Sequence, residues 1–177
     1  GIGASTSTAF AQNVLIGAGS VTANDQGNVV IGYAATSTSG EHNNVIIGQS
    51  STASRGQNVA IGYNAFAHDG VESVVIGHFA KTDSTVTNHT GQSVAVGARA
   101  NISATGSIAI GFSASILIGH SGAICIGTDV RSEKQQQVRF DTSTQFRELT
   151  MYGSFVGATH LILSSSAGSI ISMSGAL

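Results

Sequence analysis

The sequence predicts an all-β fold in which short strands stack in parallel as a solenoid of the β-roll type. The first observation is a motif of three apolar residues followed by Gly, which recurs at short and nearly regular intervals along the chain. The second is composition: the 177 residues include 23 Gly and no Pro, with 41% hydrophobic and only 9% charged residues. A chain so rich in Gly and in small and β-branched residues favours extended structure with many turns.

The motif supplies the first strand of each repeat. Its copies are Val14–Gly17, Val29–Gly32, Val45–Gly48, Val59–Gly62, Val74–Gly77, Val94–Gly97, Ile108–Gly111, Ile116–Gly119 and Ile124–Gly127. Most steps between successive motif glycines are nearly equal, but the step from Gly77 to Gly97 is longer. The steps that end at Gly119 and Gly127 are only about half as long as the others. These short last steps predict that the solenoid narrows or changes its winding there.

The remainder of each repeat predicts a second strand and two turns. A small residue stands three positions after the motif glycine, as in Ser20, Ala35 and Ala65, and a second Gly usually precedes the next motif. Two strands and two turns in about 14 residues describe one coil, and successive coils would stack about 4.8 Å apart.

The face that each side chain occupies follows from the two-residue period of a strand. We expect the first and third motif residues, Val and Ile, to face the inside of the coil. The middle residue, for example Val30, Ala60 or Cys125, would then face outward, although it is apolar in every copy. A strand that is apolar on both faces is buried on both faces, so the sequence predicts that another chain covers the outer one.

The motifs also resemble a known family. The segments Asn58–Ala67, Ser93–Ala100 and Ser107–Ala114 resemble the YadA-like head repeats of trimeric autotransporter adhesins, which phage tail fibres and spikes also use. The resemblance covers about residues 1–127. It implies a left-handed parallel β-roll, a homotrimer around one axis, and an adhesive role at a host surface.

The C-terminal part departs from that family. Adhesin heads are usually followed by a neck and a long heptad coiled coil, whereas residues 128–177 show no sustained heptads. Eight of the sixteen charged residues lie between Asp129 and Glu148, which marks a change in composition. We therefore expect β-roll repeats over residues 1–127 and a small terminal β domain over 128–177, with short strands near 145–153, 160–163 and 169–173.

Several function classes are disfavoured by composition. A net charge of −2 leaves no basic surface for nucleic acid, and no apolar run is long enough for a membrane helix, so membrane insertion is not expected. The single cysteine, Cys125, excludes an intramolecular disulfide and a cysteine-based zinc site; we expect it to pack as a small apolar residue at the subunit interface. The six histidines lack metal-binding spacing, so neither a metal nor a cofactor is expected.

Catalytic motifs are weak. The segment 119–123 partly matches the pattern G-x-S-x-G of a nucleophile elbow, but position 123 is Ala and no helix follows. No acidic residue has a recurring acidic partner of the kind that glycoside cleavage needs, although a pair formed across subunits stays open. The sequence thus predicts a protein that is not an enzyme.

Two features are candidates for binding. The residues that follow the motif glycine should form one surface column, and polar and aromatic side chains recur there: Tyr33, Gln49, Tyr63, His78 and Phe112. The second candidate is the longest insertion, between residues 81 and 91, with Lys81, Asp83 and His89.

These predictions favour a trimeric extracellular fibre or spike module that attaches to a cell-surface glycan or protein. A phage tail fibre or receptor-binding protein on the virion is favoured over a bacterial adhesin head at the outer surface. A spike depolymerase that cuts surface polysaccharide and a purely structural spacer are the alternatives. Three copies of each site would add avidity to weak single contacts.

Overall fold

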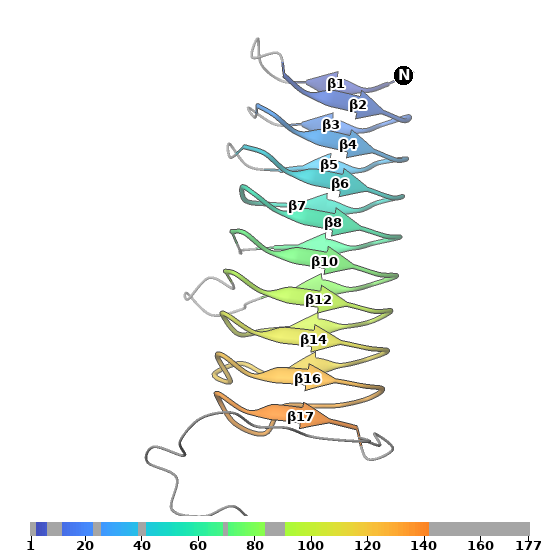
Figure 1. Cartoon of the computed structure of the whole chain (residues 1–177). Coiled ribbons are helices and arrows are strands. Elements are labelled where there is room, and N and C mark those ends of the chain that lie inside the picture. Colours follow the sequence, from blue (N-terminus) through green and yellow to red (C-terminus); the bar gives the residue numbers. More distant parts are fainter. Residues whose placement is uncertain are drawn as a thin grey trace, which may run out of the picture. The chain divides into compact units, whose positions relative to one another are not determined.

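Each repeat forms one coil that contains a three-residue strand, a turn, a two-residue strand and a second turn. The computed structural model describes residues 3–6, 12–22, 26–38, 42–68, 71–83 and 91–141. They form two parallel sheets stacked coil on coil (Figure 1). The predicted fold class, an all-β parallel solenoid of short repeats, is confirmed. No helix in this part of the chain is long and apolar enough to span a bilayer.

The first sheet has nine strands, and the motif residues form all but the last. Its strands are β2 (Val14–Ile16), β4 (Val29–Ile31), β6 (Val45–Ile47), β8 (Val59–Ile61), β10 (Val74–Ile76), β12 (Val94–Val96), β14 (Ile108–Ile110), β16 (Ile124–Ile126) and β17 (Val138–Phe140). Neighbouring strands pair without offset, so Val59 lies beside Val74 and Ile61 beside Ile76. The motif is therefore a ladder in which identical positions lie one above another.

The second sheet has eight strands of two residues each. They are β1 (Ser5–Thr6), β3 (Val21–Thr22), β5 (Thr36–Ser37), β7 (Thr52–Ala53), β9 (Phe66–Ala67), β11 (Lys81–Thr82), β13 (Asn101–Ile102) and β15 (Ser115–Ile116). The small residue that follows the motif glycine by three positions, such as Ala65 or Ala80, lies just before each strand and is fully buried. The predicted second strand of each repeat is thus present.

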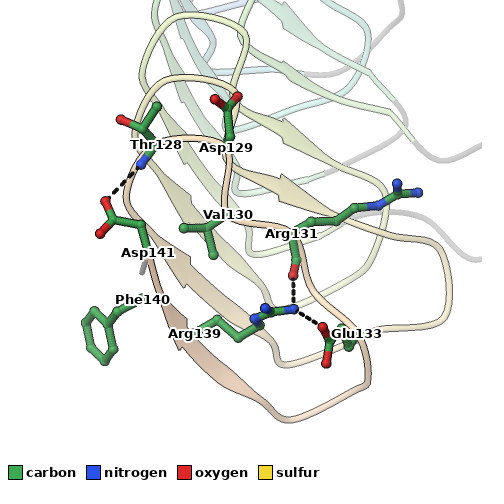
Figure 2. Close-up of a pocket in the computed structure, with 8 residues that line it drawn as sticks. All are labelled: Thr128, Asp129, Val130, Arg131, Glu133, Arg139, Phe140 and Asp141. Carbon is green, nitrogen blue, oxygen red and sulfur yellow. Dashed lines mark hydrogen bonds and ion pairs between the residues drawn. The ribbon is translucent and has the colours of Figure 1, made fainter. Parts of the chain in front are cut away.

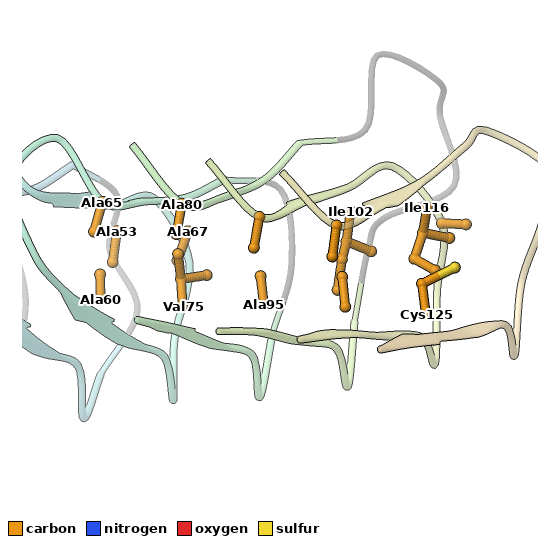
Figure 3. Packing of buried hydrophobic residues seen from close by; sticks show 14 of the residues in the cluster. Ala53, Ala60, Ala65, Ala67, Val75, Ala80, Ala95, Ile102, Ile116 and Cys125 are labelled. Atoms are coloured by element: carbon orange, nitrogen blue, oxygen red, sulfur yellow. The ribbon is translucent and has the colours of Figure 1, made fainter. Parts of the chain in front are cut away.

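The prediction of which motif residues face inward is wrong. The middle residue is fully buried inside the coil, as Figure 3 shows for Ala60, Val75, Ala95 and Cys125. The flanking Val and Ile face outward, and Ile16 and Ile110 are 55% and 38% exposed. The space between the two sheets accepts one side chain from each strand, and many of these are Ala, so two branched residues per strand do not fit.

Buried polar residues lie on the same side of the strand as the middle residue. The position before the motif is Asn in β4, β6 and β8, and these asparagines are fully buried. The side-chain oxygen of Asn28 accepts a hydrogen bond from the backbone N–H of Asn44 at 2.8 Å, and that of Asn44 accepts one from Asn58 at 2.9 Å. This asparagine ladder links successive coils through the core.

The expected narrowing of the solenoid near residue 119 does not occur. Ser115 and Ile116 form β15 of the eight-stranded sheet, so Ile116–Gly119 is not a motif copy, although its letters match. The two short steps together make one ordinary coil between β14 and β16. Leu117 and Ile118 are turn residues, and Ile118 is exposed.

The stacking continues beyond Gly127. Strand β17 pairs in parallel with β16 and places Arg139 beside Cys125, so residues 128–141 contribute one further coil. By internal contacts, the chain divides into residues 1–144 and 145–177. The expected terminal strands at 145–153, 160–163 and 169–173 lie outside the described residues, and a terminal β domain stays a prediction.

Candidate functional site

The turn after each motif presents the predicted column of binding residues. The backbone N–H of Ser50, Asn64, Phe79 and Arg99 donates to the carbonyl oxygen of Tyr33, Gln49, Tyr63 and His78 in the preceding coil, at 2.8 to 3.0 Å. Because every turn repeats this bond, Tyr33, Gln49, Tyr63, His78 and Phe112 occupy equivalent, exposed positions. The structure aligns these residues; their role in binding stays a prediction.

The aromatic side chains gather at one place along this column. The rings of Tyr63 and His78 stack with centroids 5.3 Å apart and planes 21° from parallel. Phe79 contacts both rings edge-on, with its centroid 5.4 Å from that of Tyr63 and 4.4 Å from that of His78. Tyr63 and Phe79 are 42% and 45% exposed, so the cluster faces solvent.

Phe79 was not identified from the sequence, although its position recurs. It stands two residues after the motif glycine, where every coil from Ala34 to Asp129 adopts a left-handed backbone; at Phe79 φ is 56°. Other coils place small or polar residues there, including Ala34, Ser50 and Ser113. A bulky residue in this conformation is rare and costs about 1–2 kcal/mol. The presence of a large apolar residue, where other coils have small or polar ones, could have identified Phe79 as a candidate binding residue from the sequence.

The next coil adds a cation to the same edge. Arg99 occupies the position equivalent to Phe79, and its guanidinium carbon lies 6.0 Å from the centroid of the Phe112 ring. This is within the range of a cation–π contact. In the part of the chain that the structure describes, Arg99 forms no ion pair.

Lys81 and Asp83 do not join this column, because they come from β11 and the residue after it in the other sheet. The Lys81 ammonium lies 3.5 Å from the carboxylate of Asp83, and Nδ1 of His68 lies 4.0 Å from that carboxylate. The His68 ring in turn stacks on Phe66, with centroids 4.9 Å apart. His89 lies outside the described residues. Lys81 and Asp83 are therefore separate from the aromatic column.

A cavity of about 420 Å³ lies at the last coil (Figure 2). Its lining residues are Thr128, Asp129, Val130, Arg131, Glu133, Arg139, Phe140 and Asp141. The Arg139 guanidinium donates to the carbonyl oxygen of Arg131 at 2.8 Å and forms an ion pair with Glu133. Asp141 stands where the motif has Gly, and its carboxylate accepts the N–H of Thr128 at 3.3 Å. The last coil thus concentrates charged side chains around this cavity.

The residues of the weak catalytic motif do not act together. Nδ1 of His120 lies 2.8 Å from Oγ of Ser132, so the partner of this histidine is not Ser121. The Ser132 oxygen accepts a further hydrogen bond from the backbone N–H of Leu117. Ser132 is 1% exposed, which keeps substrates away from its hydroxyl. Among the described residues, no group of three His, Cys, Asp or Glu could hold a metal ion.

The outer face of the nine-stranded sheet is an apolar surface that extends over all its strands. Each strand contributes its first and third residue, and these are Val, Ile or, in β17, Phe140. Val14, Ile16, Ile76, Ile110, Val138 and Phe140 are the most exposed. The inference that the sheet is apolar on both faces therefore stands, but the face left open is the Val and Ile face.

The comparison with solved structures finds chains of similar structure. No family model and no curated protein matches the chain. The collagen-binding domain of the Yersinia adhesin YadA is similar, with 25% sequence identity and a TM-score of 0.45, over 80% of this chain and 65% of that chain. The match thus spans less than two thirds of that domain. That adhesin is a member of the family whose head repeats the motifs of this chain resemble.

Proposed function

We propose that the chain is a trimeric, extracellular attachment module that binds a glycan or protein at a cell surface. The observation that supports this most is the apolar outer face of the nine-stranded sheet. Monomeric proteins rarely expose contiguous apolar patches of more than a few hundred Å², and larger patches mark interaction surfaces. Here Val and Ile side chains line the whole sheet from β2 to β17 without an intervening polar position.

A second and third copy of the same chain fit this face best. Its side chains repeat at the spacing of the strands, about 4.8 Å, over nine strands. A partner must offer apolar side chains with the same period over the same length, which an identical solenoid does. The trimeric state itself is what the resemblance to the adhesin heads implies.

The mass in solution tests the assembly. Light scattering should give about three times the chain mass for the unaltered protein. Replacing Ile76 and Ile110 by Glu should give a folded monomer, because charge on the outer face opposes burial while the core stays intact. The matched control, Thr36→Glu and Thr52→Glu on the outer face of the other sheet, should stay trimeric. A monomeric unaltered protein would contradict the proposal.

Attachment is tested on intact cells. A labelled trimer should be retained on host cells, and excess unlabelled trimer should compete. Retention on bacteria favours a phage tail fibre or spike, the interpretation supported by the absence of heptads after residue 128. Retention on animal cells favours a bacterial adhesin head. A protein that is trimeric but retained on no cell would be a structural spacer.

A depolymerase remains the second candidate, because the cavity at the last coil carries the carboxylates Asp129, Glu133 and Asp141. Incubation with capsular polysaccharide or lipopolysaccharide, followed by an assay for new reducing ends, distinguishes the two. An attachment module leaves the reducing ends unchanged. Sustained turnover that Asp141→Asn abolishes would replace the attachment function by an enzymatic one.

A further inference from the structure

We propose that the Tyr63, His78, Phe79 and Arg99 side chains form a binding site for an anionic saccharide, here named the turn-edge site. The proposal deepens the proposed attachment function and rests on it for its biological role. It is supported by three features: exposed rings held in a fixed arrangement, a backbone conformation that presents Phe79, and a guanidinium in the adjacent coil that forms no ion pair within the described residues.

The rings supply a stacking surface. A pyranose ring has an apolar face of C–H groups, and packing this face on an aromatic ring removes apolar area from water on both sides. Tyr63 and Phe79 each leave more than 40% of their surface exposed, and contacts with His78 hold them in place. A ligand therefore loses little free energy in ordering these side chains.

The backbone at Phe79 indicates that the ring is there for a purpose other than folding. Equivalent positions in other coils are filled by Ser50 and Ser113, so the turn forms without an aromatic side chain. Phe79 adds strain and exposes apolar surface, both of which disfavour the free protein. A ligand that covers the ring removes this apolar surface from water and so offsets the unfavourable free energy of exposing it.

Arg99 sets the charge of the ligand. Its side chain is exposed and lies one coil beyond Phe79, about 4.8 Å along the stack. A guanidinium pairs with planar carboxylates through two parallel hydrogen bonds and also binds sulfate oxygens. The Phe112 ring below it fixes its position, and within the described residues no carboxylate neutralises it. An acidic group on the sugar fits this cation.

Space for the sugar comes from Ala98. It occupies the column position between His78 and Phe112, so the backbones at these two residues lie two coils, or about 10 Å, apart, and the column residue between them has only a methyl side chain. A sugar stacked on Tyr63, His78 and Phe79 can thus extend its acidic group to Arg99. Gln49 and the half-buried Asn64, next to Tyr63, offer amide groups for sugar hydroxyls.

Calorimetric titration of the unaltered full chain tests the site. The probes are trigalacturonic acid, a sulfated galactan oligosaccharide and neutral galactotriose. At least one anionic probe should bind, galactotriose should bind about tenfold more weakly or not at all, and added salt should weaken the binding. Binding of the first probe alone identifies a carboxylate sugar as the ligand, and binding of the second alone a sulfated one.

Substitutions locate the binding. Phe79→Ser and Arg99→Ser introduce the residue that other coils already have at this position, so the fold is retained, and each should weaken binding about tenfold or more. The matched control is Phe66→Ser in β9 of the other sheet, where the equivalent residue of β15 is Ser115, and it should leave binding unchanged.

Three results would overturn the proposal: no binding of either anionic probe by folded protein, equal binding of galactotriose, or equal losses in Phe66→Ser and Phe79→Ser. Light scattering in the same buffer separates this outcome from failure of the proposed function. A trimer that adheres to cells but binds no probe refutes only the turn-edge site. A monomer that binds an anionic probe refutes only the trimer.

Discussion

Gly62 and Gly77 stack so closely that Gly62 leaves no room for a side chain. A Cβ atom added to Gly62 would lie 2.4 Å from the carbonyl oxygen of Gly77 in the next coil, and φ at Gly62 is 138°. The same contact, at 2.2 to 2.4 Å, recurs at each motif glycine from Gly17 to Gly111. The motif glycine is thus fixed by the approach of one coil to the next.

Replacing Gly62 by Ala should destabilise the protein by more than about 3 kcal/mol, because both the backbone angle and the neighbouring carbonyl oppose a Cβ atom. Gly106→Ala is the matched control: its φ is 64° and no atom lies within 4 Å of the added Cβ. The control should lose only about 1–2 kcal/mol. Urea denaturation measures both, and equal losses would refute the explanation.

Asn44 carries two bonds of the asparagine ladder, one through its backbone N–H and one through its side-chain oxygen. Asn44→Ala should leave the buried N–H of Asn58 without its acceptor and cost about 1–3 kcal/mol of unfolding free energy. Asn44→Ser should lose less, since Ser93 places its hydroxyl 3.5 Å from the N–H of Ser107 in the same column. If the two variants unfold at the same urea concentration, the ladder contributes nothing.

Ala95 of β12 and Ile102 of β13 lie in contacting strands and are both buried in the core, and so are Ala109 of β14 and Ile116 of β15. Ile102→Ala should cost about 2–5 kcal/mol by leaving a cavity, and Ala95→Ile should cost about 1–3 kcal/mol by overpacking. The double variant restores the summed volume and should be more stable than either single variant. Additive losses in thermal unfolding would show that the two positions do not share one space.

Cys125 occupies a middle motif position inside the coil, and its burial raises the thiol pKa above the usual 9.0, while Arg139 lowers it to a smaller extent. The native thiol should therefore resist alkylation at neutral pH until the protein unfolds. As pH rises above about 9, the unfolded chain loses its thiol proton first, so stability should fall.

The variant Cys125→Ala keeps a residue type already present at this position in β8, β12 and β14, and it should remove that pH dependence. The comparison is a urea titration of both proteins at pH 7 and at pH 10. If the unaltered protein and the variant lose the same stability between these pH values, another group is responsible. Rapid alkylation of native protein would show that the thiol is not enclosed.

The candidate site was predicted only in part. The spacing of the repeat places Tyr33, Tyr63 and Phe112 in one column, because equal register stacks equal positions. Phe79 and Arg99 were missed, since the column that they form is defined by a left-handed backbone at a non-glycine residue. Residue type does not predict this conformation, because residues as different as Ala34, Arg99 and Asp129 adopt it.

The sequence by itself determined the parallel stack, because a motif of fixed length ending in Gly brings like residues together in every coil. It also determined that both faces of the motif strand are apolar. Only the tertiary structure decided which face is the core and that Ile116–Gly119 is not a motif copy. Side chains that alternate with period two along a strand give the same sequence pattern whichever face of the strand is buried. The pattern alone therefore does not identify the core face. The narrow space between the sheets, which accepts Ala60 but not both Val59 and Ile61, decides the orientation.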